Sequence, residues 1–230
     1  MKILKANYEI LTPISEGGIE ELKHIERIGR VCYKSEDKIT EDGESAKKFV
    51  KMLVSLGHEA MIEHGSISVK FTVDRGVSHE MVRHRLASFA QESTRYVNYS
   101  KDKFGNEIQV IDIMDGIALD KKMSKMKTCE VEPILTEWFS AIRDAEKHYM
   151  KMIELGATPQ IARSVLPNST KTEITITADY REWRHFLKLR TPESAHPQIR
   201  EVAIPLLKDF QRLIPVIFDD IEVEVHDINE

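Results

Sequence analysis

Arginine and histidine side chains gather in residues 74–96, which read DRGVSHEMVRHRLASFAQESTRY. This segment holds four arginines and two histidines among small hydroxyl residues, whereas the whole chain carries a formal net charge of -5. Guanidinium groups bind phosphates and carboxylates through charge-assisted, often bidentate hydrogen bonds. A local site for an anionic ligand is therefore one interpretation of the segment. A solvated charged face is the alternative, because runs of charge usually face water.

The spacing within this segment bears on how many sites it serves. Suppose that residues 75–87 form a helix. Glu80, Arg83 and His84 then share one face by their i, i+3 and i, i+4 spacing. Arg85 projects about 200° away from Arg83, at 100° per residue. Since one pocket in one chain cannot readily use all three basic residues, either the helix ends among them or they serve two sites or two subunits.

A second basic cluster follows the apolar alternation of residues 173–180. On a helix that starts near Arg181, His185 lies within about 40° of Arg181, and Arg190 lies on the opposite face. The cluster therefore again implies two ligands, or basic side chains that point in two directions. A further arginine, Arg163, stands among apolar residues at the end of a short predicted helix. It needs an anionic partner, which is either a ligand or a structural carboxylate.

The segment HEAMIEH, which begins at His58 and ends at His64, invites a zinc interpretation. A zinc protease of the zincin type places two histidines at i and i+4 on one helical face. Here the histidines stand six residues apart, which is about 240° around a helix. A polar turn before the strand at residue 66 is favoured, and no metal site is expected.

Cys32 and Cys129 are the candidate covalent nucleophiles. A nucleophilic cysteine needs a nearby base or helix N-terminus that lowers its pKa. Cys32 belongs to an apolar helical face, and Cys129 lies in a stretch rich in Lys and Glu without a neighbouring histidine. Buried or inert thiols are therefore expected at both positions.

Length and composition describe an ordinary globular chain. It has 230 residues, of which 41% are hydrophobic, with 10 Gly and 8 Pro and without a repeat or linker that would divide it. We expect no membrane association, because no apolar run reaches the roughly 18 to 20 residues that a bilayer requires. A pI of about 6.0 also disfavours a nucleic-acid partner. With two cysteines and no secretory signal, a cytoplasmic protein is expected.

Hydrophobic periodicity predicts the elements that position the basic clusters. Residues 66–73 and 173–180 alternate as strands, and these two strands should form the heart of a sheet. We therefore expect an α+β fold, a central, mainly antiparallel sheet packed with helices, as a single domain over residues 1–230. The other predicted elements are a strand in residues 1–6 and helices over 16–33, 46–56, about 130–155 ended by Gly156, and from Pro197 with a kink or restart at Pro205.

The basic segments also occur in a recognisable order. Arg83, His84 and Arg85 are followed after seven residues by Ser93, which is the RHR-x7-S signature, and with it the chain resembles the flavin-dependent thymidylate synthases. The similarity spans about residues 25–205. It includes His58-Glu59 to Glu63-His64, Ser93-Thr94-Arg95-Tyr96, Ile161-Ala162-Arg163 to Pro167, Arg181 to Arg190, and Ala195-His196.

The resemblance implies an enzyme that makes dTMP from dUMP. Methylenetetrahydrofolate would be the carbon donor, NADPH the reductant and FAD the redox carrier. It also implies a homotetramer whose active sites are built from several subunits. A catalytically altered homologue that binds flavin and nucleotide without turnover is the alternative within the same family.

The family's site residues carry over by position. Arg190 takes the catalytic role, since a guanidinium against the N3 and O2 side of uracil would stabilise developing negative charge without a cysteine nucleophile. Glu80 stands where Gln is common in the family. The resemblance assigns FAD binding to His58, Arg83, His84, Arg85, Gln91, Asp179, Arg181 and His185. It assigns dUMP binding to Glu80, Arg83, Gln91, Glu92, Ser93, Arg95, Arg163 and Arg190.

Overall fold

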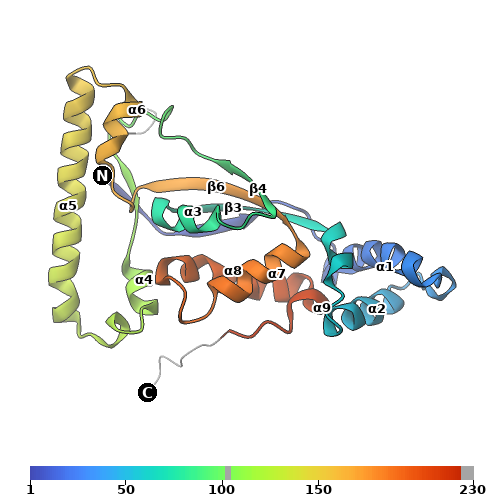
Figure 1. Cartoon of the computed structure of the whole chain (residues 1–230). Helices are drawn as coiled ribbons and strands as arrows, with labels where there is room; N and C mark the ends of the chain where they lie inside the picture. Colours follow the sequence, from blue (N-terminus) through green and yellow to red (C-terminus); the bar gives the residue numbers. More distant parts are fainter. Residues whose placement is uncertain (102–104, 224–230) are drawn as a thin grey trace.

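A four-stranded antiparallel sheet in the order β2-β3-β6-β4 forms the centre of the fold (Figure 1). The computed structural model describes residues 1–101 and 105–223. The expected α+β fold with a mainly antiparallel sheet is confirmed, and the two strands predicted to be its heart are β3 and β6. The strands are β2 (Asn7–Ile10), β3 (Ser66–Asp74), β4 (Ala87–Gln91) and β6 (Lys171–Asp179).

The alternation of β3 explains why it lies inside the sheet. Ile67, Val69 and Phe71 are at most 1% exposed, while the side chains between them are partly exposed. Val69 stands opposite Ile176 of β6, so the apolar sides of the two strands coincide. A slip by one residue would turn this whole apolar set to the other face.

The first residues of the chain serve two different sheets. β1 (Lys2–Leu4) pairs in parallel with β5 (Gln109–Ile111), and β2 then pairs antiparallel with β3. The strand predicted within residues 1–6 is therefore shorter than expected, and β2, β4 and β5 were not predicted. Each of these strands has only three to five residues, too few for a clear alternation.

Helices α7 and α8 pack together below the sheet in Figure 1 and carry an aromatic core. The ring of Trp183 lies 5.5 Å from Phe186 and 5.5 Å from Phe210, and its indole N–H donates to the carbonyl of Ile67 in β3 at 2.9 Å. This contact locks α7 against the sheet. The two helices are α7 (Tyr180–Arg190) and α8 (Pro197–Leu213).

The remaining helices lie around this centre. α1 and α2 pack together at one end of the molecule, and the long α5 stands at the other end (Figure 1). α5 ends two residues before Gly156, whose φ of +93° suits glycine, so this predicted stop is confirmed. The bounds are α1 (Ile19–Tyr33), α2 (Glu44–Ser55), α3 (Arg75–Met81), α4 (Met114–Leu119), α5 (Thr128–Glu154), α6 (Pro159–Ala162) and α9 (Pro215–Phe218).

Two helices end at places that bear on the sequence analysis. α8 runs as one helix through Pro205, so the alternative of a restart there is wrong, and a new helix begins instead at Pro215, the first residue of α9. α3 ends at Met81 rather than continuing to residue 87. Residues 82–86 form a turn because the chain must enter β4, whose pairing with β6 begins at Ala87. Arg83 and Arg85 therefore do not occupy opposite faces of one helix.

Candidate functional site

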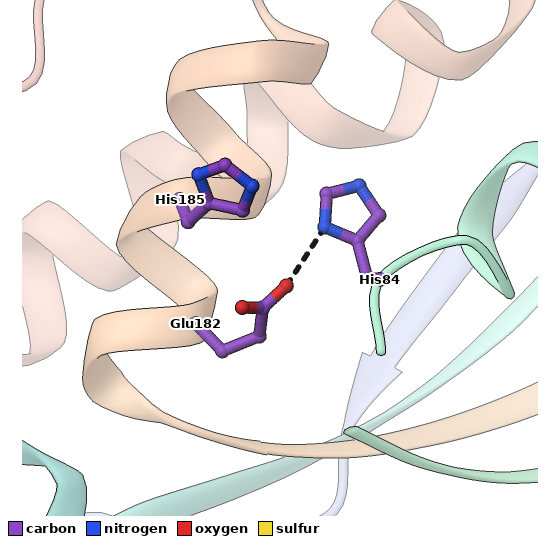
Figure 2. A group of neighbouring side chains, drawn as sticks. All are labelled: His84, Glu182 and His185. Carbon is purple, nitrogen blue, oxygen red and sulfur yellow. Dashed lines mark hydrogen bonds and ion pairs between the residues drawn. The ribbon is translucent and has the colours of Figure 1, made fainter. Parts of the chain in front are cut away.

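His84 occupies a buried position in the turn between α3 and β4, facing α7. Its Nδ1 lies 2.9 Å from Glu182 Oε1 (Figure 2). On its other side, Nε2 lies 3.2 Å from Nε of Arg190. An arginine nitrogen can only donate, so His84 Nε2 accepts this bond and Nδ1–H donates to Glu182. Burial lowers the pKa of His84, against the opposing effect of the Glu182 carboxylate, and the imidazole is neutral at neutral pH.

These contacts bear on metal binding. Ligand atoms of His84, Glu182 and His185 all lie within 4.8 Å of one another, a grouping that could in principle hold an ion. Coordination through His84 Nδ1 would displace the proton that bonds Glu182 and would leave Nε2–H against the donating Arg190. Figure 2 shows the Glu182 carboxylate directed at the His84 ring. The geometry favours a hydrogen-bonded cluster, and the expectation of no metal stays a prediction.

Arg190 ends α7 and is held by Glu80 of α3. Its Nη1 donates to Glu80 Oε2 at 2.8 Å and its Nη2 to the Glu80 carbonyl at 3.3 Å. The second carboxylate oxygen of Glu80 lies 2.8 Å from Nδ1 of His196. The Glu80 carboxylate thus lies between a guanidinium and an imidazole, and the positive charge of Arg190 stabilises its negative charge. The structure thus brings together Glu80, His84 and Arg190, which we call the Arg190 cluster.

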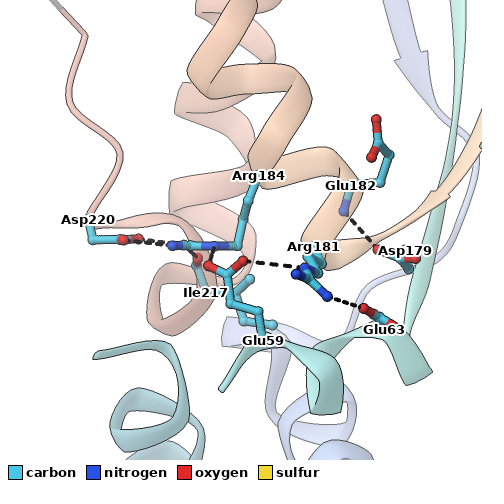
Figure 3. A network of polar contacts seen from close by, with 8 residues as sticks. All are labelled: Glu59, Glu63, Asp179, Arg181, Glu182, Arg184, Ile217 and Asp220. Carbon is cyan, nitrogen blue, oxygen red and sulfur yellow. Dashed lines mark hydrogen bonds and ion pairs between the residues drawn. The ribbon is translucent and has the colours of Figure 1, made fainter. Parts of the chain in front are cut away.

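Arg181, at the start of α7, faces the segment between His58 and His64. Its Nη1 lies 2.5 Å from Glu63 Oε1, and its Nε lies 3.8 Å from Glu59 Oε2 (Figure 3). Asp179 caps the helix by accepting from the Glu182 N–H at 2.7 Å. The acids of HEAMIEH therefore serve as ion-pair partners of α7, and residues 59–64 form a 3₁₀ turn, in agreement with the favoured polar-turn interpretation.

Arg184 shows what a structural arginine of α7 looks like. It is 2% exposed and pairs with Glu59 at 3.0 Å and with Asp220 at 2.5 Å (Figure 3). It also donates to the Ile217 carbonyl. These bonds tie α7 to the chain after α9 and lower the pKa of the Asp220 carboxyl. Each of its three nitrogens donates at least one bond within the fold.

A cavity of about 460 Å³ opens beside Arg181 and Arg184 of α7. Cavities of this size are within the usual range for small-molecule sites. Leu86, which lines it, is 71% exposed. Nearby in sequence, Arg83 and Arg85 are exposed and make no ion pair with any residue in the described ranges. The cavity is lined by Glu59, Leu86, Arg181, Glu182, Arg184, His185 and Lys188.

The loop after β4 meets the segment around Arg163. Arg163 Nη1 donates to Thr94 Oγ1 at 3.3 Å, and Arg95 Nε donates to Gln160 Oε1 at 3.2 Å. Both bonds are to neutral groups, so neither guanidinium is neutralised by a carboxylate through them. Three of the residues that the resemblance assigns to dUMP, Ser93, Arg95 and Arg163, thus belong to segments in direct contact.

Two other predicted residues of this loop are held by β6 and α3. Gln91 Nε2 donates to Ser78 Oγ at 2.9 Å and to Thr172 Oγ1 at 3.3 Å. Glu92 Oε2 accepts from Lys171 Nζ at 3.1 Å. These contacts fix the start of the loop.

The cysteines and His58 lie apart from these contacts. Cys32 in α1 and Cys129 in α5 are both exposed. Of the two alternatives expected for these thiols, burial is wrong, and inert thiols stay a prediction. His58 is exposed and immediately precedes the 3₁₀ turn. Glu182 and His196 were not among the site residues that the sequence analysis predicted. The only local signal for Glu182 was its place three residues after Asp179, the helix-capping spacing.

Comparison with known proteins identifies the family of the chain. Residues 19–216 match the family model described as thymidylate synthase complementing protein. A protein of Corynebacterium aurimucosum named flavin-dependent thymidylate synthase is 32% identical over 215 residues, covering 91% of this chain and 84% of the relative. This chain belongs to the flavin-dependent thymidylate synthase family. A relative of that name from Mycobacterium sp. (strain KMS) is 31% identical and covers 86% of this chain and 79% of its own.

A solved structure shares the fold of this chain. A crystal structure described as the UMP/dUMP methylase PolB from Streptomyces cacaoi bound with 5-Br dUMP superposes with a TM-score of 0.76. The two chains are 23% identical, and the match covers 95% of this chain and 96% of PolB. Across the described residues, none of the helices combines the length and apolar character needed to cross a membrane.

Proposed function

We propose that this protein methylates dUMP to dTMP, with methylenetetrahydrofolate as carbon donor, NADPH as reductant and FAD as redox carrier. The family relatives carry the name of this activity, and PolB is described as a UMP/dUMP methylase. The observation that carries the proposal is the Arg190 cluster. It joins two family motifs that are 106 residues apart in sequence, through the bond between Arg190 and His84.

The residues proposed for FAD fit an anionic cofactor. The exposed guanidiniums of Arg83 and Arg85 have no ion-pair partner among residues 1–101 and 105–223 and suit a diphosphate. Arg181 and His185 line the cavity beside them. When bound, FAD would supply the redox chemistry. The full proposed set is His58, Arg83, His84, Arg85, Gln91, Asp179, Arg181 and His185.

Arg190 is proposed to act on the pyrimidine ring. A planar guanidinium can donate to two ring atoms at once and can stabilise negative charge that develops on the ring. Glu80 and His84 hold it in one orientation before substrate binds, which lowers the cost of ordering it. No cysteine is required, and both thiols are exposed on helices outside the cluster.

The nucleotide would lie between the Arg190 cluster and the 93–95 loop. Ser93, Arg95 and Arg163 are proposed to bind the phosphate, because two guanidiniums without carboxylate partners among the described residues suit a dianion. The remaining proposed dUMP residues are Glu80, Arg83, Gln91 and Glu92. Glu80 would act through Arg190, since both oxygens of its carboxylate already face Arg190 and His196.

We also propose a cytoplasmic homotetramer with shared active sites and without nucleic-acid or membrane partners. The exposed Arg83, Arg85 and Leu86 beside the cavity suit a site completed by another copy. Light scattering tests the proposal, and a fully active monomer would refute it.

The decisive experiment is the absorption spectrum of the purified protein with and without dUMP, followed by dTMP formation from all substrates. Flavin that responds to dUMP, together with dTMP production, supports the proposed function. Stoichiometric flavin without any dUMP-dependent reaction would identify the catalytically altered homologue instead. Failure to bind FAD at micromolar concentration would refute both.

A further inference from the structure

His196 lies at the end of the connection between α7 and α8 and contacts the Arg190 cluster. Arg190 is the last residue of α7, and His196 immediately precedes Pro197, the first residue of α8. Both ends of this connection meet the same carboxylate. Glu80 Oε2 accepts from Arg190 Nη1 at 2.8 Å, and Glu80 Oε1 lies 2.8 Å from His196 Nδ1. Glu80 is therefore held between two basic side chains.

The Nδ1 atom of His196 carries a hydrogen. It is buried, and no residue in the described ranges forms an aligned hydrogen bond with it. An unprotonated ring nitrogen would present its lone pair to the Glu80 carboxylate at 2.8 Å and would be repelled. Since this short contact is not an aligned hydrogen bond, attraction between opposite charges holds the two groups together.

The Nε2 atom of His196 also faces an acceptor. It lies 3.1 Å from Oε1 of Gln198, in the first turn of α8. The amide nitrogen of Gln198 is committed elsewhere, because it donates to Asp74 Oδ2 at 2.7 Å. The other oxygen of Asp74 accepts from the Val77 N–H at 2.7 Å, so this carboxylate accepts on both sides. The oxygen of Gln198 is thus left for His196, and Nε2 donates to it.

The charges around His196 favour a cation at this position. Glu80 of α3 faces the ring directly, and Asp74 at the end of β3 lies behind Gln198. Asp120, which follows α4, lines a cavity of about 260 Å³ together with His196. The positive end of α8 and the Arg190 guanidinium oppose a cation, but the Glu80 carboxylate lies between Arg190 and the imidazole. The side chain of His196 is 35% exposed, so it can exchange a proton with solvent.

We propose that His196 is a positioning residue for the reaction and acts as an imidazolium that holds Glu80 in the orientation that fixes Arg190. The three side chains form a row of alternating charge, with the Glu80 carboxylate between two cations. Loss of the proton from His196 leaves Glu80 with one cationic neighbour, and Arg190 then loses part of its fixed geometry. This inference rests on the proposed function for the reaction that Arg190 serves, and on the contacts of Glu80 and Gln198 for the charge of His196.

The test is a double-mutant cycle in the FAD-loaded protein. His196→Gln removes the charge and keeps a hydrogen-bonding side chain, Glu80→Gln removes the carboxylate, and a third variant carries both changes. His148→Gln is the matched control, because His148 is an exposed histidine of α5. kcat and KM for dUMP are measured from about pH 6 to about pH 9, a range that spans the titration of most histidines. Free energies of unfolding are measured by urea denaturation at both ends of this range.

We expect His196→Gln to lower kcat about tenfold near pH 6, because one charge-assisted contact of Glu80 is lost. The KM for dUMP and the FAD content should change less than about threefold, since the residues proposed for phosphate and FAD are intact. The ratio of wild-type kcat to that of His196→Gln should fall toward equality as the pH rises and the imidazolium loses its proton. His148→Gln should match wild type.

The cycle also tests the route from His196 to Arg190. In the Glu80→Gln background, the further change His196→Gln should have little effect, because the connecting carboxylate is already gone. The ratio of wild type to Glu80→Gln should show the same fall with pH, which keeps the test valid if His196→Gln does not fold.

Two results would overturn the inference. One is a kcat ratio that stays constant with pH, as expected if Asp74, whose pKa is raised by burial, carried a proton and let the Gln198 amide turn over. The other is an equal loss on His196→Gln with and without the Glu80 carboxylate, because His196 would then act by a different route.

The unfolding measurements separate this inference from the proposed function. The coupling free energy between His196 and Glu80 should be present near pH 6 and lost near pH 9, whatever reaction the protein catalyses. If that coupling is found and no dTMP forms, the thymidylate synthase proposal is wrong and the charged pair of His196 and Glu80 stands. If dTMP forms and the coupling is absent at both pH values, the proposed function stands and the role of His196 is refuted.

Discussion

Arg190→Lys is the substitution that most directly tests the proposed mechanism. The side chain of Arg190 is 19% exposed and donates from three different nitrogens, to His84, to the Glu80 carboxylate and to the Glu80 carbonyl. Lysine keeps the positive charge but has a single nitrogen on a flexible stem. It can retain the ion pair with Glu80, but it cannot also reach His84 and two atoms of a pyrimidine ring.

The expected loss follows from these bonds. Removal of one preorganised donor from a charge-stabilising site costs roughly 3 kcal/mol of transition-state stabilisation, which is about a hundredfold in rate. The variant also leaves His84 Nε2 as a buried acceptor without its donor, which costs about 1 to 3 kcal/mol of folding stability. We therefore expect dTMP formation to fall about a hundredfold or more and the melting temperature to drop modestly.

The assay measures dTMP formation, FAD content and NADPH oxidation by the same preparations. FAD content and NADPH oxidation should largely survive, because neither uses the pyrimidine ring. Arg212→Lys is the control, since Arg212 is 68% exposed and pairs with Asp209 on its own helix. If Arg190→Lys loses FAD while keeping dUMP affinity and turnover per bound flavin, Arg190 belongs to the cofactor site and the mechanism is wrong.

Three further predictions concern other parts of the chain. The double change Cys32→Ser with Cys129→Ser should keep dTMP formation within about tenfold, because both thiols are exposed on helices outside the site; complete loss in folded protein would restore a cysteine mechanism. Burial raises the pKa of Glu201 to about 8. Between the ordinary pKa of the unfolded chain and pH 8, the native state therefore binds a proton that the unfolded state does not. The free energy of unfolding falls as the pH rises through this range. Glu201→Gln should therefore flatten the decline in unfolding free energy from pH 5 to pH 8 by roughly 2 kcal/mol, measured by urea denaturation; an unchanged slope would contradict it. Gly65→Ala should destabilise the fold by about 1 to 3 kcal/mol, since its added Cβ would lie 2.2 Å from the buried Tyr180 ring, and an unchanged denaturation midpoint would exclude that clash.

Several elements could be predicted because their signals are local. Apolar residues alternate along β3 and β6 and recur at helical spacing along α5, and these patterns predict which side of each element is buried. The period of the side chains alone determines the buried side. The family signature likewise needed only the order and spacing of its residues.

The Arg190 cluster required the tertiary structure. Glu80 and Arg190 are 110 residues apart, and no periodicity along the chain states that α3 and the end of α7 meet. The end of α3 at Met81 was decided by the pairing of β4 with β6, which draws the chain out of the helix. Local sequence encodes the face that an element buries, whereas its partners depend on contacts between distant segments that form only when the whole chain folds.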